Sequence, residues 1–375
     1  MARVIDLTNL SGIYATRLLA EVGHDVIRVE PRSGDAIRRM GPYLKEKQDL
    51  EHGAFHQFLN AGKRSLALDT STAAGRWILD RLIGTADVVV ANSPLPFDEN
   101  AITKANPKLV LTAVVDDSDP DICAYARSGL LSITGHPGQR PTLMGGRVYY
   151  AATGAYIGVA TAAAILVAQE TGQGQTVRVS IMECLESLFE QAMVTYASTG
   201  KSTERRGFRG AVSAVSGAFP CADGYWMVSL SSSAENWNRF MNWMQDPVLA
   251  AQPELADEAE RNVKRDFILD RIGAWAAQFK KDDLVVESQS RHIPSAPVTT
   301  PFDLARDPQL IDRGFLQTVN HPEFGEVLFP VGAIASLRGS KITLAPTLGQ
   351  HTSEILEELG YDEIDRRALL ESGVV

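Results

Sequence analysis

Six residues flank predicted strands at the places where an α/β sheet binds ligands. In an open sheet of this kind the ligand crevice lies outside the carboxyl ends of the strands. Arginine and lysine side chains there would hold an anion such as a phosphate or a carboxylate. The six residues, near the strands predicted at 25–30, 65–68 and 87–91, are Arg32, Arg38, Lys63, Arg64, Leu68 and Asn92. We predict that they line a ligand crevice; the alternative, charges that only solvate loops, stays open.

The segment "GGRVYYAATGAYIGVATAAAILVAQETGQGQ", residues 145–175, has no acid before its predicted helix. The pattern predicts a polar loop, a buried helix of small residues and a glycine-rich turn. Neither Asp nor Glu occurs between Ile122 and Gln169, and a tyrosine pair, Tyr149 and Tyr150, precedes the helix instead. This stretch therefore supplies no carboxylate as nucleophile or base.

The composition predicts a soluble cytoplasmic protein of one large or two moderate domains. The net charge of −10 disfavours nucleic acid as a partner, because binding to phosphate backbones needs clustered Lys and Arg. The three cysteines, Cys123, Cys184 and Cys221, are far apart and lack CxxC spacing, so we expect neither a metal site nor a disulfide framework. The most apolar run, 151–168, is short and rich in Ala and Gly, so we expect no membrane span.

The first third of the chain alternates strands and helices. Strands are predicted at Val4–Leu7, Asp25–Glu30, Ser65–Leu68 and Asp87–Ala91, with helices between them. Such alternation predicts a parallel sheet covered on both faces, as in a Rossmann-like fold. The turn "LTNLSGIYATR" contains only Gly12, which excludes the glycine fingerprint of dinucleotide-binding dehydrogenases.

Several segments carry a resemblance to a known family. They are "VIDLTNLSGIYATRLLAEVGHDVIRVEPRSGDAIRRMGP", "NAGKRSLALDTSTAAGRWIL", "AAILVAQETGQGQTVRVSIME" and "APTLGQHTSEILEELGY". With the segments between them, they resemble the class III CoA-transferases (CaiB/BaiF-like), a group that includes formyl-CoA transferase, carnitine CoA-transferase and the 2-methylacyl-CoA racemases. The resemblance implies coenzyme A as ligand and acyl-CoA and carboxylic acids as substrates.

The resemblance also implies a domain organisation. We expect a large Rossmann-like domain built from both chain ends, residues 1–205 and 330–375, and a small central α+β domain, residues 206–329. A basic, Gly/Ser-rich stretch, "KSTERRGFRGAVSAVSG", is consistent with a boundary near residue 205. Family members form interlocked dimers, in which two ring-like subunits are threaded through each other.

The family's reacting residue is missing. Active members carry an aspartate at a fixed distance before the "TGxGQ" turn and before a glycine of the helix. In this chain the same distances from Thr171 and Gly154 lead to Tyr150. A carboxylate attacks a thioester and afterwards accepts CoA on its own carbonyl, whereas a phenol has no carbonyl to which CoA could be joined.

Further departures affect the parts that would touch coenzyme A. Family members usually show "ENFRPG" followed by an arginine. The matching segment of this chain, "ANSPLPFDEN", has Asn100 with acidic neighbours where that cation is expected. The glycine-rich loop that covers the reacting carboxylate corresponds to "FRGAVSAVSG", which has no glycine run. His136 lies near the racemase region, but its acidic partner would again be position 150, so racemase activity is disfavoured. For His351 we expect a structural role.

Three hypotheses follow from these residues. The first is a non-catalytic subunit of a heteromeric CoA-transferase, paired with a homologous subunit that carries the aspartate, as in the benzylsuccinate CoA-transferase type, which uses succinyl-CoA. The second is an active homodimer that uses another carboxylate, Asp121 or Glu183. The third is a protein that binds CoA or acyl-CoA without turnover.

Overall fold

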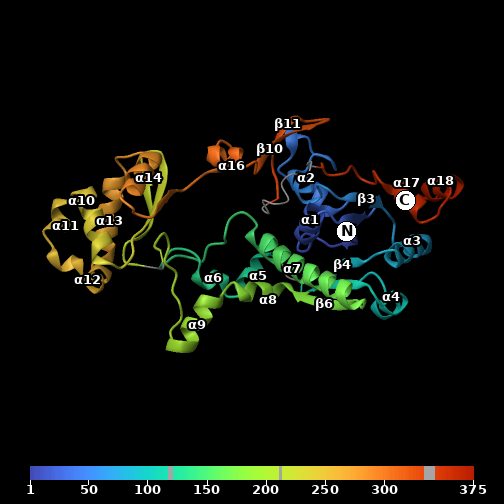
Figure 1. Ribbon diagram of the computed structural model, residues 1–375, viewed down its shortest axis with the longest axis horizontal. Coiled ribbons are helices and arrows are strands. Elements are labelled where there is room, and N and C mark those ends of the chain that lie inside the picture. Colours follow the sequence, from blue (N-terminus) through green and yellow to red (C-terminus); the bar gives the residue numbers. More distant parts are fainter. Residues whose placement is uncertain (117–120, 211–212, 333–342) are drawn as a thin grey trace. The chain divides into compact units, whose positions relative to one another are not determined.

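A computed structural model describes residues 1–116, 121–210, 213–332 and 343–375 (Figure 1). The described chain divides into two compact units. Unit 1 contains Met1–Leu130, Met144–Ser198 and Pro308–Val375, and unit 2 contains Leu131–Leu143 and Thr199–Asp307. The domain limits predicted above, 1–205 with 330–375 and 206–329, stay a prediction.

Unit 1 contains a six-stranded sheet in which all neighbouring strands are parallel. Its strand order is β3-β2-β1-β4-β5-β6. The strands are β1 (Arg3–Leu7), β2 (Asp25–Glu30), β3 (Arg64–Ala67), β4 (Val88–Asn92), β5 (Val110–Val115) and β6 (Gln175–Ser180). The predicted α/β fold class is confirmed. This order changes direction between β1 and β4, which is where a Rossmann-like sheet binds its ligand.

Helices cover both faces of this sheet, because alternate strand residues point to opposite sides. Ile5, Ile27 and Leu111 belong to a core that includes residues of α3 (Ala73–Gly84) and α17 (Thr352–Glu358). On the other face Thr112 shares a hydrogen bond of 2.9 Å with Thr161 of α7 (Val148–Thr171). The other helices of this unit include α1 (Ile13–Glu21), α2 (Ala54–Leu59), α4 (Glu99–Ala105), α5 (Asp121–Arg127), α8 (Ile181–Ser187), α9 (Glu190–Thr199) and α18 (Glu363–Glu371).

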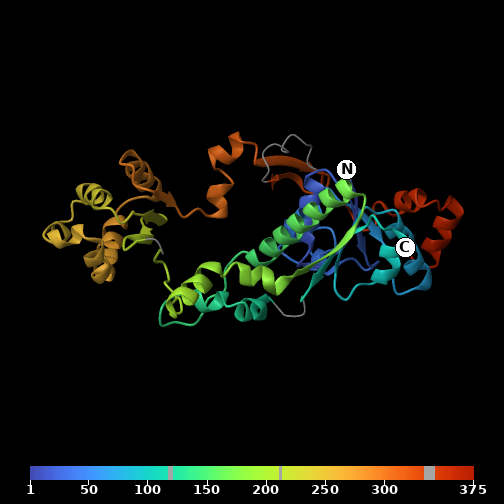
Figure 2. The same cartoon turned by 60° about the horizontal axis from the view of Figure 1, so that its bottom comes forward.

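Helix α7 is a core helix of the sheet domain. Among the described residues it alone has the length and apolar composition of a membrane span. It packs instead against α1, β5 and β6, and Figure 2 shows it lying along β6. Small residues permit the close approach to α1, since a Cβ added at Gly154 would lie 2.7 Å from the Cβ of Tyr14. This contact fixes the first turns of α7 and with them position 150.

Helix α17, the last helix but one, is held to β3. Its N-cap residue is His351, and no side chain caps the helix, although Thr352 and Ser353 follow directly. Thr352 Oγ1 instead accepts a hydrogen bond of 3.1 Å from the backbone N–H of Ala67, and His351 Nδ1 accepts one of 3.2 Å from Ser65. Both side chains therefore accept hydrogen bonds from backbone N–H groups at the exposed edge of β3.

Two β-hairpins lie outside the six-stranded sheet. β7 (Ser216–Cys221) pairs with β8 (Gly224–Ser229), and β10 (Leu316–His321) pairs with β11 (Gly325–Pro330), both antiparallel. The first hairpin belongs to unit 2, where β9 (Ser295–Pro297) completes a three-stranded sheet. Tryptophans 226 and 237 lie in the apolar core of this unit, which is built with the helices α10 (Ala234–Met244), α12 (Glu258–Val263), α13 (Arg265–Ala276) and α14 (Lys281–Ser290).

Candidate active site

The loops after β1 and β4 are joined at the carboxyl edge of the sheet. Asn92 Oδ1 accepts a hydrogen bond of 2.8 Å from the backbone N–H of Asn9, and its Nδ2 donates one of 3.0 Å to Ser11 Oγ. A Cβ added at Gly12 would lie 2.8 Å from Thr8 Cγ2, so only glycine fits this turn without a shift. Asn92 therefore joins the loop after β4 to the loop after β1, and we call this junction the closure of the crevice between the two halves of the sheet.

A cavity of about 540 Å³ opens beside this closure, at the carboxyl ends of β1, β2 and β3. Its walls are Leu7, Val29, Glu30, Pro31, Arg32, Ser33, Leu68, Asp69, Thr70, Ser71, Leu79 and Pro96. Arg32 is exposed and donates a hydrogen bond of 3.0 Å to the carbonyl of Gly373, while Leu68 is buried in the wall. Two of the predicted ligand residues thus line one cavity, at the edge where the fold binds ligands.

Arg38 lies inside the protein. Its side chain is fully buried and donates to Glu30 at 2.6 and 2.9 Å and to Glu51 at 2.8 Å. Burial alone would raise the pKa of Glu30, but the hydrogen bonds and charge of Arg38 lower it to about 2. Arg38 also donates to the carbonyl of Pro346, so it links β2 to the segment before α17. In this conformation its guanidinium faces carboxylates and not the cavity.

Lys63 is equally enclosed. Its ammonium donates to Asp6 Oδ2 and Thr16 Oγ1, each at 2.9 Å, and to the carbonyl of Ile13 at 3.3 Å. Arg28 and the Thr8 hydroxyl bind the other oxygen of Asp6. Burial would raise the pKa of Asp6, but the charges of Lys63 and Arg28 hold it well below its usual range. Lys63 therefore neutralises a buried carboxylate and fixes the start of α1.

Arg64 joins β3 to α17. It contacts Glu358 at 2.6 Å, Glu354 at 2.9 Å and Asp25 at 3.3 Å. Of the six predicted ligand residues, the structure brings Arg32 and Leu68 to the cavity and Asn92 to the adjacent closure. It places Arg38, Lys63 and Arg64 in ion pairs. Binding of coenzyme A by the six stays a prediction.

Position 150 lies in a cluster of aromatic rings and one cation. Tyr150 is half-buried, and its ring centroid lies 4.6 Å from that of buried Tyr149. The guanidinium of Arg147 lies 6.0 Å from the Tyr150 ring and 4.7 Å from the ring of Phe55 on α2. Phe55 and Arg147 were not predicted: the contact is long-range, and the only signal was a lone cation two residues before the tyrosine pair.

The alternative carboxylates are placed differently. Glu183 is exposed in the first turn of α8, where its backbone N–H donates to Ser180 Oγ at 3.2 Å. The side chain of Asp121, the first residue of α5, lies outside the described residues.

Asn100 is exposed near the start of α4. His136 packs in unit 2 beside Phe208, with ring centroids 6.1 Å apart. Residues 211 and 212 of the "FRGAVSAVSG" loop also lie outside the described residues.

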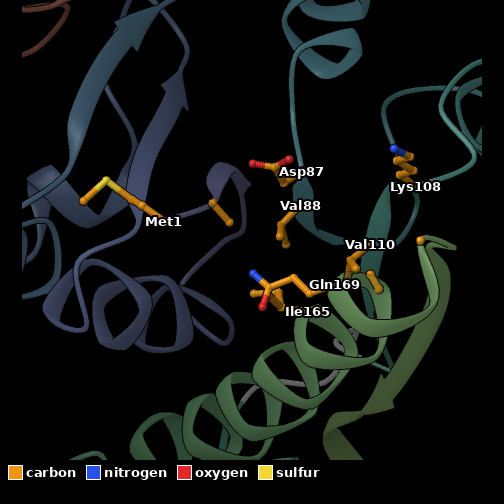
Figure 3. Close-up of a pocket in the computed structure, with 10 residues that line it drawn as sticks. Met1, Asp87, Val88, Lys108, Val110, Ile165 and Gln169 are labelled. Carbon is orange, nitrogen blue, oxygen red and sulfur yellow. The ribbon is translucent and has the colours of Figure 1, made fainter.

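A second cavity, of about 290 Å³, lies at the opposite, amino-terminal edge of the sheet (Figure 3). Asp87 and Val88 come from the start of β4, Val110 starts β5, and Ile165 and Gln169 come from the end of α7. Ligands of open α/β sheets bind at the carboxyl edge, so the cavity beside Arg32 is the better candidate.

Comparisons with known proteins identify relatives of the whole chain. The family model described as CoA-transferase family III matches residues 2–352. Succinyl-CoA:mesaconate CoA-transferase of Haloarcula hispanica is 30% identical over 96% of this chain and 95% of that protein. Succinyl-CoA:(R)-benzylsuccinate CoA-transferase subunit BbsE of Thauera aromatica is 30% identical over 100% of this chain and 97% of that protein. The crystal structure of a CaiB/BaiF family protein from Brucella suis is 25% identical, has a TM-score of 0.83, and covers 96% of this chain and 98% of its own.

Proposed function

The chain belongs to CoA-transferase family III, and from that premise we propose that it is the subunit without the reacting aspartate in a heteromeric CoA-transferase. The enzyme would move coenzyme A from an acyl-CoA such as succinyl-CoA to a free carboxylic acid, including acids of the aryl-succinate type. The observation that carries the proposal is Tyr150, which stands where the family's acid is expected and lies among aromatic rings.

The chemistry excludes Tyr150 as a replacement. In the family's exchange, a carboxylate oxygen attacks the donor thioester to give a mixed anhydride and a CoA thiolate. The thiolate then attacks the enzyme's own acyl carbon, releasing the donor acid and leaving an enzyme-CoA thioester. A phenol, with an ordinary pKa of about 10, offers no acyl carbon for this second step. The chain alone would therefore stop before CoA transfer.

The surface of unit 1 supports a protein partner. Helices α7 and α9 expose several large apolar side chains, and extended exposed apolar surface is typical of protein–protein contacts. They are Tyr156, Val159, Leu166, Val167, Met193, Val194 and Tyr196. We propose that an aspartate-bearing homologue covers them in an interlocked dimer. A relative that matches all of this chain over 97% of its own length and is itself a subunit, BbsE of Thauera aromatica, supports this arrangement.

The cavity beside Arg32 supports a reduced role in holding coenzyme A. Among the described residues that form its walls, Arg32 is the only Arg or Lys, and it already donates to the carbonyl of Gly373. Two carboxylates, Glu30 and Asp69, also line the cavity, although CoA carries several phosphate charges. Cation–phosphate pairs provide much of the affinity in such sites. We therefore propose that this chain binds coenzyme A only weakly.

Trapping of the enzyme-CoA thioester tests the proposal. The purified chain, incubated with succinyl-CoA and then treated with borohydride or hydroxylamine, should show no modified carboxylate by mass spectrometry. Tyr150→Asp should not create one either, because cations for the phosphates are still missing; Tyr156→Asp, an exposed site on the same helix, is the control. Co-expression with an aspartate-bearing homologue should place the adduct on that homologue and raise its activity.

Three results would contradict the assignment as a non-catalytic subunit. A trapped adduct on this chain alone, at Asp121 or Glu183, would support the active homodimer. Full turnover of Tyr150→Asp without a partner would also contradict the heteromer. Tight binding of CoA without either adduct or partner would support a protein that binds CoA without turnover.

A further inference from the structure

A carboxylate just after β3 lines the cavity beside Arg32. This carboxylate is Asp69, and its Oδ1 accepts hydrogen bonds from the hydroxyl and the backbone N–H of Ser71, at 2.6 and 2.9 Å. These bonds lower the pKa of Asp69, so the carboxylate is ionised at neutral pH. Among the residues that the structure describes, none donates a hydrogen bond to its Oδ2. One carboxylate oxygen is therefore open to a donor on a ligand.

The other carboxylate of this cavity, Glu30, is not open in the same way. In Rossmann-like sheets an acidic residue about twenty positions after the first turn accepts a hydrogen bond from a ribose hydroxyl. Glu30, the last residue of β2, is placed for this role, but it is buried and accepts from Arg38 at 2.6 and 2.9 Å and from Ser65 Oγ at 2.8 Å. Asp69 follows the neighbouring strand, since β3 pairs with β2. Asp69 can therefore accept the ribose hydroxyl that Glu30 cannot.

The remaining walls of the cavity suit a nucleoside better than a chain of phosphates. Arg32 brings one positive charge, and Asp69 offsets it with a negative one. A ribose hydroxyl donates a hydrogen bond without adding charge, whereas a phosphate beside Asp69 would meet a like charge. Apolar side chains, which would contact the flat base, come from Leu7, Val29, Leu68 and Leu79.

We propose that this cavity binds a ribonucleotide whose 3′-hydroxyl is free and donates to Asp69 Oδ2. The inference rests on the proposed function, in which this chain holds coenzyme A only weakly, and it specifies which ligand the cavity prefers. Coenzyme A carries a phosphate on the 3′-oxygen of its ribose, where dephospho-coenzyme A has a hydroxyl. The phosphate removes the hydrogen-bond donor and places negative charge beside the Asp69 carboxylate. The cavity therefore selects against coenzyme A at the ribose.

Two pairs of ligands that differ only in the 3′-phosphate test this preference. One pair is dephospho-coenzyme A and coenzyme A, and the other is AMP and adenosine 3′,5′-bisphosphate. Calorimetric titration of the full-length chain should show that the member with the free 3′-hydroxyl binds more tightly in both pairs, by about tenfold or more. In Asp69→Asn this preference should fall to about threefold or less, because asparagine keeps an oxygen for Ser71 but not the charge.

Asp80→Asn is the matched control. Asp80 is exposed on α3 and is not a wall of the cavity, so removing the same charge there should leave the preference at its original value. Equal affinities within either pair for the unaltered chain, or no binding of either member, would overturn the proposal. A preference that Asp69→Asn leaves unchanged would overturn it as well. These results leave the heteromer untouched, because that proposal depends on the location of the trapped thioester.

The same titrations distinguish two sources of the ligand. If both pairs show the preference, tighter binding of dephospho-coenzyme A than of AMP identifies a precursor of coenzyme A as the ligand. Equal binding of the two identifies a free nucleotide. Either outcome supports recognition of the 3′-hydroxyl by Asp69, since both ligands carry it.

Discussion

Two groups of cations near the carboxyl edge of the sheet differ in what surrounds them. Arg38 and Lys63 are buried, and each donates hydrogen bonds to carboxylates at 2.6–2.9 Å. Arg147 is exposed and lies on aromatic rings, with no carboxylate partner in the part of the chain that the structure describes. The first group is committed to the fold, whereas Arg147 is not held by a carboxylate in the described residues.

The difference shows why residue type alone does not identify a ligand site. A buried cation without a partner is costly, so Arg38 and Lys63 require Glu30 and Asp6 beside them. An exposed cation has no such requirement, because water solvates it. The two groups should therefore respond differently: substitutions of the buried cations or their partners lower stability strongly, whereas substitution of Arg147 changes stability little.

The largest effect is expected at Asp6. Asp6→Ala leaves Lys63 and Arg28 buried without their shared carboxylate, and breaking such a pair costs about 3–5 kcal/mol of the free energy of unfolding. Asp25→Ala is the control, because Asp25 pairs with Arg3 and Arg64 near the surface and should cost about 1 kcal/mol or less. Urea unfolding measures both. Equal losses in the two variants would show that burial does not distinguish these pairs.

A slightly smaller effect is expected from acid. The pKa of Glu30 is lowered to about 2 in the folded chain and lies near 4.5 in the unfolded chain. Because the folded value is the lower one, the stabilisation is complete above pH 4.5 and is lost as the pH falls toward 2. Glu30 contributes roughly 3 kcal/mol in this way. In Glu30→Gln, the slope of the unfolding free energy against pH over this window should correspond to about one proton fewer. An unchanged slope would show that Glu30 does not cause this pH dependence.

An intermediate effect is expected where α7 meets α1. A Cβ at Gly154 would lie 2.7 Å from Tyr14 Cβ and 3.2 Å from the backbone nitrogen of Ala15, whereas one at Gly158 would lie 3.6 Å from Leu18 Cδ1. Both glycines are inside one helix, so the helix propensity gained with alanine cancels. Gly154→Ala should therefore be about 1–3 kcal/mol less stable than Gly158→Ala in thermal or urea unfolding. Equal stability would mean that α1 shifts freely against α7.

Much of the fold could be predicted from the sequence, because alternating strands and helices follow from local hydrophobic patterns. The strand predicted at Asp25–Glu30 has those limits in the structure, and the α7 helix extends beyond the predicted 151–168 at both ends. The role of Thr352 could not be predicted, because its hydroxyl accepts a hydrogen bond from a neighbouring strand, a long-range contact that a local pattern does not contain.

The candidate site was only partly predictable. The loss of the acid at position 150 follows from the sequence and its resemblance to the family. The surroundings of Tyr150 do not, because Arg147, whose guanidinium lies over the Tyr150 ring, also packs on Phe55, a residue of a helix almost one hundred positions earlier. Likewise, the spacing of Arg38 and Lys63 from their strands indicated proximity to the carboxyl edge, but their carboxylate partners became evident only in three dimensions.

The smallest effect on stability is expected at Arg147. Its exposed cation–π contacts should contribute about 0.5–1 kcal/mol, and substitution removes no buried charge. Arg147→Gly relieves the left-handed backbone as well, since glycine adopts a φ of 52° without strain, so it should be at least as stable as Arg147→Ala. Thermal unfolding of the two variants measures this difference. A loss comparable to that of Asp6→Ala would place Arg147 among the structural cations, and the contrast between the two groups would not hold.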